Sequence, residues 1–161
     1  MNPSQRPVAS SDGVRRRMSA QATRDTAPEM ALRRELHRRG LRYRVSTRPI
    51  RSLRRTADVV FTKAHVAAFV DGCFWHGCPE HGTLPTANSD WWEAKILANA
   101  GRDRATDLAL EAGGWTVVRC WEDEESSVVA DRIEAALAKT LALEIPTNRP
   151  AASNFGNQSG S

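Results

Sequence analysis

Apolar positions along the chain fall into blocks with two periods, one helical and one extended. In the first block Leu32 and Leu36 recur at the spacing of one helix face, which predicts a helix from Thr26 to about Arg39. Gly40 follows and is expected to end this helix. The rest of its surface is rich in arginine, and we expect these side chains to face solvent: Arg33, Arg34, Arg38 and Arg39.

Four later segments have strand character, because β-branched and aromatic residues are frequent in them. They cover residues 41–45, 57–61, 66–70 and 115–121. Two more helices are predicted at residues 91–113 and 128–143, the first with Trp92, Ile96 and Leu97 as core positions. This order of elements predicts an α/β fold in which a mixed sheet carries helices on both faces.

The ends of the chain lack any apolar period. Residues 1–17 are predicted to form a disordered basic arm and residues 146–161 a disordered tail, which leaves one domain at residues 18–145. No apolar run approaches the length of a membrane span, and the N-terminus lacks a hydrophobic signal core. A cytoplasmic protein without membrane contact is therefore expected.

Charge is distributed unevenly along the chain. Residues 1–65 contain 16 Lys and Arg against 5 Asp and Glu, a net charge of +11, whereas residues 66–161 contain 7 against 14, a net charge of −7. The basic excess is mostly arginine, whose guanidinium donates bidentately to phosphate. A connector between two predicted strands holds four of these arginines: Arg48, Arg51, Arg54 and Arg55. The pattern favours a nucleic-acid partner over a merely solvated basic surface.

One loop combines metal-ligand types at close spacing. Cys73, Cys78 and His81 can offer three tetrahedral positions to a structural zinc ion, and the alternative is a buried pair of reduced cysteines. A fourth ligand must come from elsewhere, and either Asp123 or Cys120 is placed to supply it.

Asp58 stands at the head of an apolar strand, where an unpaired carboxylate is costly. It either binds a hard cation such as Mg²⁺, or caps a turn or pairs with Arg54 or Arg55. His76, which the zinc site can spare, can transfer protons beside a magnesium-binding carboxylate. Two aromatic pairs, Phe74–Trp75 and Trp91–Trp92, indicate core residues or a wedge that unstacks DNA bases.

Several motifs occur together in an order that resembles the very-short-patch-repair (Vsr) DNA mismatch endonucleases. They are Thr23-Arg24-Asp25-Thr26-x-x-Glu29, Gly40-Leu41-x-Tyr43-Arg44-Val45, Asp58, residues 71–82, Trp92-x-x-Lys95-Ile96-x-x-Asn99, Arg102-Asp103, Gly114-Trp115 and Trp121-Glu122. The resemblance implies a restriction-endonuclease-like fold and a magnesium-dependent nick in double-stranded DNA beside a T:G mismatch. It further implies a monomer associated with the bacterial nucleoid, together with mismatch-repair and repair-synthesis proteins.

Residue roles follow from the same resemblance. Asp58 and the main-chain carbonyl of Val70 are expected to hold magnesium, and His76 to be the catalytic histidine. Glu29 and Asp103 match supporting acids. The implied zinc ligands are Cys73, Cys78, His81 and Asp123, with Cys120 as the alternative to Asp123. Expected DNA contacts are Met18, Arg24, Arg54, Arg55 and the wedge residues Phe74, Trp75 and Trp92.

The chain also departs from the family pattern. Asp71 stands where some members have a second active-site histidine, and Asp123 where the fourth zinc ligand is usually His or Cys. An acid at position 71 is expected to change how the site holds its metal or shares protons. Two other functions remain open: a zinc-stabilised DNA-binding protein without cleavage, and a nuclease of the same fold with different substrate selection.

Overall fold

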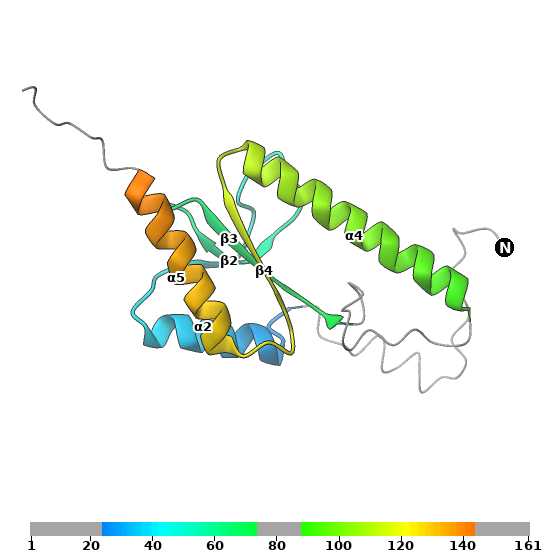
Figure 1. Cartoon of the computed structure of the whole chain (residues 1–161), viewed down its shortest axis with the longest axis horizontal. Helices are drawn as coiled ribbons and strands as arrows, with labels where there is room; N and C mark the ends of the chain where they lie inside the picture. Colours follow the sequence, from blue (N-terminus) through cyan, green and yellow to red (C-terminus); the bar gives the residue numbers. More distant parts are fainter. Residues whose placement is uncertain (1–23, 74–87, 144–161) are drawn as a thin grey trace, which may run out of the picture.

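The computed structural model describes residues 24–73 and 88–143. The predicted terminal segments, residues 1–17 and 146–161, lie outside this part, as do six predicted functional residues: Met18, Phe74, Trp75, His76, Cys78 and His81. The described elements are, in order, α2 (Ala27–Arg38), β1 (Arg44–Thr47), β2 (Ala57–Phe61), β3 (Val66–Asp71), α4 (Ser89–Ala112), β4 (Thr116–Trp121) and α5 (Ser126–Leu143) (Figure 1).

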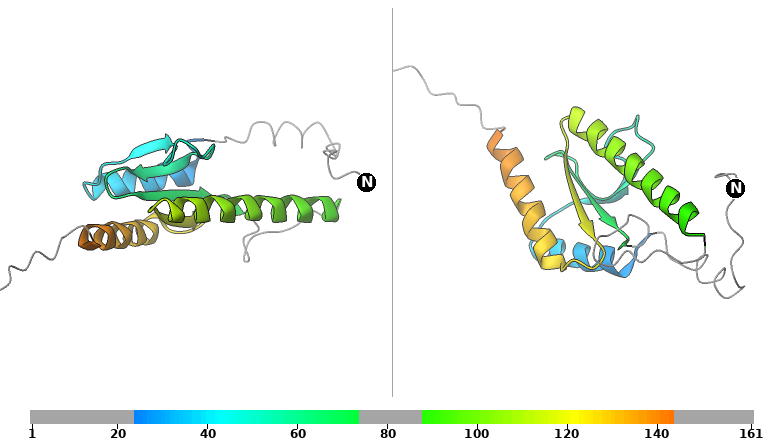
Figure 2. Two further views of the ribbon diagram at one scale, coloured as in Figure 1. Left: turned by 90° about the horizontal axis from the view of Figure 1, so that it is seen from above. Right: turned by 45° about the vertical axis from the view of Figure 1, so that its right-hand side comes forward.

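The four strands form one mixed sheet in the order β1-β2-β3-β4. The pairs β1–β2 and β2–β3 are antiparallel, whereas β4 runs parallel to β3 after the crossover through α4. Helices α4 and α5 lie on either side of β4 (Figures 1 and 2). The α/β class and the mixed sheet between helices are thus confirmed. The described residues contain no helix long and apolar enough to cross a membrane.

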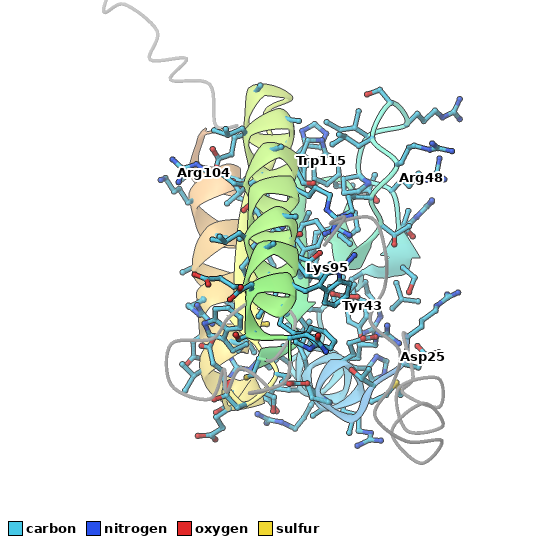
Figure 3. The ribbon with its side chains drawn as sticks, turned by 90° about the vertical axis from the view of Figure 1, so that its right-hand side faces the viewer. Asp25, Tyr43, Arg48, Lys95, Arg104 and Trp115 are labelled. Atoms are coloured by element: carbon cyan, nitrogen blue, oxygen red, sulfur yellow. The ribbon has the colours of Figure 1, made fainter. Side chains whose placement is uncertain are left out.

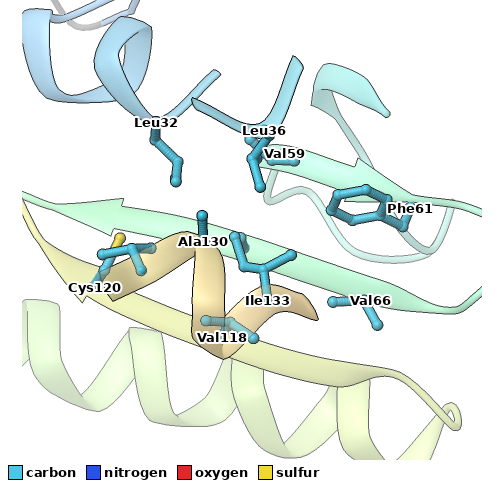
Figure 4. Close-up of a cluster of buried hydrophobic side chains, with 11 residues drawn as sticks. Leu32, Leu36, Val59, Phe61, Val66, Val118, Cys120, Ala130 and Ile133 are labelled. Carbon is cyan, nitrogen blue, oxygen red and sulfur yellow. The ribbon is translucent and has the colours of Figure 1, made fainter. Parts of the chain in front are cut away.

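Each face of the sheet has its own apolar core. On one face, α2 and α5 bury Leu36 and Ile133 completely against alternate strand residues such as Val59 and Val118 (Figure 4). On the other face, Leu110 of α4 packs with the second set of strand residues and with Trp115 just before β4. Cutting Leu36 to alanine would cost about 2–5 kcal/mol, because the site cannot collapse around the missing methyl groups.

Two glycines end helices, and Gly40 does so as predicted. Gly40 and Gly114 both have φ of +79°, a backbone conformation that other residues rarely adopt. After α2, the N–H of Leu41 donates to the carbonyl of Leu36, and after α4 the N–H of Trp115 donates to that of Leu110. This 6→1 bond is the mark of the Schellman motif, which satisfies carbonyls that the helix end leaves open.

Three details differ from the sequence-based expectation. Arg33 is buried, not solvated, because it lies between the carboxylates of Asp25 and Glu29. Leu97 is 65% exposed instead of part of the core, since the N-terminal part of α4 extends beyond the strands (Figure 1). Strand β1 begins at Arg44, three residues later than predicted, because its pairing with β2 starts only there, opposite Val60.

Candidate active site

The regular strand pattern of β2 breaks at Asp58. Ala57 packs in the core beside α4 and Val59 in the core beside α2, although residues two apart in a regular strand share one face. β1 and β2 pair at Val45–Val59 and at Thr47–Ala57, but Ser46 and Asp58, which lie between these two pairs, are not a paired position. Ser46 itself has φ of +46°. Such an irregularity re-aims a side chain, and here it re-aims Asp58.

Asp58 is a partly buried carboxylate whose charge is opposed by its surroundings. Burial raises its pKa to about 6, and the negative charges of Glu29 and Asp71 act in the same direction. The N–H of Val70 partly offsets these effects by donating to Oδ2 of Asp58 at 2.8 Å. A cation bound at this carboxylate would relieve the remaining cost.

Glu29, on the first turn of α2, is buried, and both of its carboxylate oxygens accept hydrogen bonds. One of its oxygens accepts from the N–H of Asp25 at 2.9 Å and from Arg33 at 3.2 Å, and the other accepts from the hydroxyl of Thr26 at 3.0 Å. Thr26 itself makes no side-chain cap bond to the helix. Arg33 therefore neutralises the acid closest to Asp58 on the α2 side. Its spacing of four from Glu29 is the sequence signal that identifies such a pair.

Asp71, at the end of β3, is neutralised by Arg119 of β4. Both carboxylate oxygens of Asp71 accept from Nη1 of Arg119 at 2.9 Å. Nε and Nη2 of Arg119 also donate to Asp107 of α4 at about 2.9 Å, and the guanidinium lies 4.6 Å from the centre of the Phe69 ring. Sequence reasoning gave Arg119 no role, although a lone cation between the buried Val118 and Cys120 was a visible signal.

Asp103 of α4 lies within reach of two arginines. It forms an ion pair with Arg55 of the connector between β1 and β2, and Nη2 of Arg119 lies 3.8 Å from it. Arg55 is thus committed to Asp103, which removes it as the partner considered for Asp58. All four predicted acids of the described part gather at the end of β3: Glu29 and Asp58 towards α2, Asp71 and Asp103 towards α4.

The ends of β3 and β4 bring two of the predicted zinc ligands together. Sγ of Cys73 lies 3.1 Å from a carboxylate oxygen of Asp123, and the N–H of Cys73 donates to Glu122 at 2.9 Å. Cys120 faces the core instead: its thiol lies 3.4 Å from the carbonyl of Phe69, and burial raises its pKa to about 12. Within residues 24–73 and 88–143 there is no group of three metal-ligand residues, and Cys78 and His81 lie outside these ranges.

The expected DNA contacts of the described part differ in exposure. Trp92 is buried and meets the ring of Trp91 edge-on at 4.8 Å, which agrees with the core interpretation of this aromatic pair. Arg24 and Arg54 are exposed. Arg55 is half-exposed, but its guanidinium is held by Asp103.

Comparison with known proteins identifies the class. The family model described as DNA mismatch endonuclease Vsr matches residues 10–80. The Type II nicking enzyme V.NaeI of Lentzea aerocolonigenes is 43% identical over 121 residues, which cover 74% of this chain and 73% of the relative. The Type II nicking enzyme V.XorIIP of Xanthomonas oryzae pv. oryzae is 41% identical over 131 residues, covering 79% and 92%. The DNA mismatch endonuclease Vsr of Escherichia coli is 38% identical over 108 residues, covering 65% and 66%.

These similarities show that the protein is a DNA endonuclease. More narrowly, the chain belongs to the Vsr family, which comprises DNA mismatch endonucleases and related nicking enzymes.

Proposed function

We propose that this protein is a magnesium-dependent endonuclease that nicks one strand of duplex DNA beside a T:G mismatch and so starts very short patch repair. The observation that carries the proposal is Asp58, a carboxylate that a break in β2 turns out of the sheet pattern and that burial makes costly to ionise. Residues kept in a costly state next to a cluster of acids are typical of active sites.

The residues present fit a magnesium ion. Magnesium prefers hard oxygen ligands, and Asp58 offers a carboxylate with only one oxygen engaged by a described residue, the N–H of Val70. We assign the ion to Asp58 and the main-chain carbonyl of Val70. When bound, the ion would stabilise negative charge on the scissile phosphate. His76 would transfer the proton, and Glu29 and Asp103 would hold the surrounding arginines in place.

The departure at Asp71 has a physical account in this proposal. Because Arg119 donates to both of its oxygens, the charge of Asp71 beside the metal position is neutralised, and Asp71 does not act as a second acid there. Asp71 would then help to position Arg119, and His76 would transfer the proton.

For zinc, we assign Cys73, Cys78, His81 and Asp123 as ligands. The contact between Cys73 and Asp123 supports Asp123 over Cys120, whose thiol faces the core between the sheet and α2. A mixed thiolate, imidazole and carboxylate set is within the ligand chemistry of zinc. The ion would tie the loop after β3 to the end of β4.

Mismatch recognition is assigned to the aromatic residues Phe74, Trp75 and Trp92, which would enter the stack beside the T:G pair, and to Met18 from the other groove. Unstacking costs least where the bases are mismatched, so a wedge favours T:G over paired DNA. The name of the Escherichia coli relative, a DNA mismatch endonuclease, supports this substrate. Trp92 would have to leave its buried position to join the wedge.

A second candidate is a nicking enzyme with different substrate selection, because several relatives are named Type II nicking enzymes. The test uses end-labelled duplexes with T:G, other mismatches or full pairing, incubated with Mg²⁺. The proposal expects a nick confined to T:G, lost in Asp58→Asn and His76→Ala while binding is kept. Nicking of paired DNA would favour the second candidate, and binding without any nick would favour a DNA-binding protein.

A further inference from the structure

The arginines of the described residues divide into two groups by their partners. Arginines on helices and on β4 mostly meet carboxylates, as Arg33 does with Glu29, Arg39 with Glu35 and Arg119 with Asp71. Among the exposed arginines that form no ion pair with any described residue, Arg34, Arg102 and Arg104 lie on helices and Arg24 precedes α2, whereas five others, which we name the arginine edge, are clustered in and around β1. The arginine edge consists of Arg42, Arg44, Arg48, Arg51 and Arg54.

The sequence around the arginine edge excludes acids. Residues 36–57 contain eight arginines and no Asp or Glu, although acids are frequent elsewhere in the chain. Of these eight, Arg38, Arg39 and Arg55 reach carboxylates outside residues 36–57. The remaining five guanidiniums therefore present their charge to solvent without local compensation, which is the arrangement that binds phosphate.

Arg44 of the arginine edge lies in the strand next to the one that carries Asp58. Among the described strands, β1 lies at the edge of the sheet and pairs with β2 alone, the strand that carries Asp58. Arg44 precedes Ser46 by two residues, or about 7 Å along the strand, and Ser46 lies opposite Asp58 at the unpaired register position. That length equals roughly two base-pair steps of DNA at about 3.4 Å each. Figure 3 shows Arg48 on the outer side of the connector, away from α4.

We propose that the arginine edge is the track for the DNA backbone that leads to Asp58. Its five guanidiniums would neutralise consecutive phosphates flanking the cleavage position, independently of base sequence. This inference rests on the proposed function only for the position of the nick. It differs from the sequence-based set of contacts in one respect, since it assigns Arg54 to the track but not Arg55, which pairs with Asp103.

Charges on an edge strand also prevent unwanted pairing with other sheets. That role requires one or two charges on the strand itself. Here three of the five arginines, Arg48, Arg51 and Arg54, lie in the connector beyond β1, where there is no strand edge to protect. Their number and their lack of acidic partners therefore need another explanation, and a polyanion supplies it.

The experiment measures how DNA affinity depends on salt. A fluorescein-labelled, fully paired duplex is titrated with full-length protein without magnesium, at several KCl concentrations, and the logarithm of the binding constant is plotted against the logarithm of salt concentration. The test variant is Arg48→Gln/Arg51→Gln/Arg54→Gln. The control is Arg38→Gln/Arg104→Gln/Lys139→Gln, which removes the same charge from exposed positions elsewhere, and Figure 3 shows Arg104 on the opposite side from Arg48.

The slope for the test variant is expected to be shallower by about 0.9 for each arginine removed, with an affinity loss of about eightfold per arginine at 0.1 M salt. T:G and paired duplexes should lose affinity equally, and the control should keep the slope of the wild type. An unchanged slope in the test variant, or an equal change in the control, would overturn the proposal. If the slopes behave as expected but the wild type never nicks T:G duplex, the proposed function alone has failed.

Discussion

Asp58 keeps a carboxylate where burial and two neighbouring acids all oppose its ionisation. Only the N–H of Val70 and the charge of Arg33 act the other way. A residue chosen for stability alone would be uncharged here, so the carboxylate is explained by what it binds. The candidate site is therefore recognisable from the unfavourable free energy of ionising Asp58 in the protein without a bound cation.

Replacing this carboxylate should separate catalysis from folding. In Asp58→Asn we expect nicking to fall at least 1,000-fold, an order of magnitude typical of losing a metal ligand, with DNA affinity retained. The pKa of Asp58 is about 6 in the folded protein and 3.8 in the unfolded chain, so protonated Asp58 favours the folded state. This contribution to folding stability is lost as pH rises from about 4 through about 6.

In the absence of Mg²⁺, the Asp58→Asn variant should therefore be more stable than the wild type at pH 8, by on the order of 1 kcal/mol. The difference in stability should shrink towards pH 4. Thermal melts at both pH values measure it. A variant that is equally destabilised at both values would show that Asp58 is a structural residue.

Two cysteines should respond differently to replacement. Cys73→Ser is expected to lose zinc and stability, because Cys73 lies beside Asp123 at the end of the sheet. Cys120→Ala should keep its zinc and lose only about 1–2 kcal/mol, as expected for a small cavity in the core. Zinc content by elemental analysis, together with urea denaturation, distinguishes them. Zinc lost from Cys120→Ala and retained in Asp123→Asn would reverse the assignment.

Some residue roles were visible in the sequence and others were not. The unusual position of Asp58, an acid at the head of an apolar strand, could be read from the sequence, whereas its assignment to a metal comes from the family resemblance. The break in β2 could not, since it depends on Ser46 across the sheet, twelve residues earlier. Arg33 was misjudged because a helix of arginines resembles a solvated face, and only the fold shows that Asp25 and Glu29 enclose it.

At the scale of elements, Arg119 connects three of them. It joins the end of β3 through Asp71 and α4 through Asp107 from its own place in β4. Because β3 and β4 are parallel neighbours, this ion pair lies near the strand ends that carry Val70, Cys73 and Asp123. The geometry of the candidate site therefore depends on the packing of α4 against the sheet.

Removing this connection should be costly. Arg119→Met is expected to lose about 3–5 kcal/mol in urea denaturation, because it removes the positive charge that Arg119 places against the buried Asp71. Adding Asp71→Asn should recover part of that loss, since the uncompensated charge is then gone. Arg132→Met is a matched control, because its pair with Glu124 is more exposed and should contribute no more than about 1 kcal/mol. No recovery in the double variant would contradict the account of Arg119.

Element boundaries show which patterns in a sequence are reliable. Strand β2 was predicted with its observed bounds, because an apolar run bounded by polar connectors has few alternatives. In α4 the existence of the helix was predicted but its core positions were only partly right. Trp92 is buried while Leu97 is exposed, since the helical period identifies a face but cannot tell where the sheet beneath it ends.

At the scale of the whole molecule, charge and structure agree. The basic first part of the chain supplies α2 and the β1–β2 hairpin, and the acidic second part supplies helices whose carboxylates pair with Arg39 and Arg55. The arginine edge, which has no acidic partner among the described residues, lies in and around β1, next to the strand that carries Asp58. In the proposed function this layout would bring DNA to the strand that carries the candidate metal ligand and would keep the polyanion away from the acidic helices.

We infer that the end of the sheet around Asp58 nicks one strand of T:G-mismatched DNA. The most direct measurement labels each strand of a T:G duplex with its own dye and follows both under single-turnover conditions with Mg²⁺, beside a fully paired duplex of the same sequence. The account predicts a single nick in the strand that carries the mismatched thymine, at least 100-fold faster than any cleavage of paired DNA, a ratio well within mismatch discrimination by base unstacking. Equal cleavage of both duplexes, or cleavage of both strands, would contradict it.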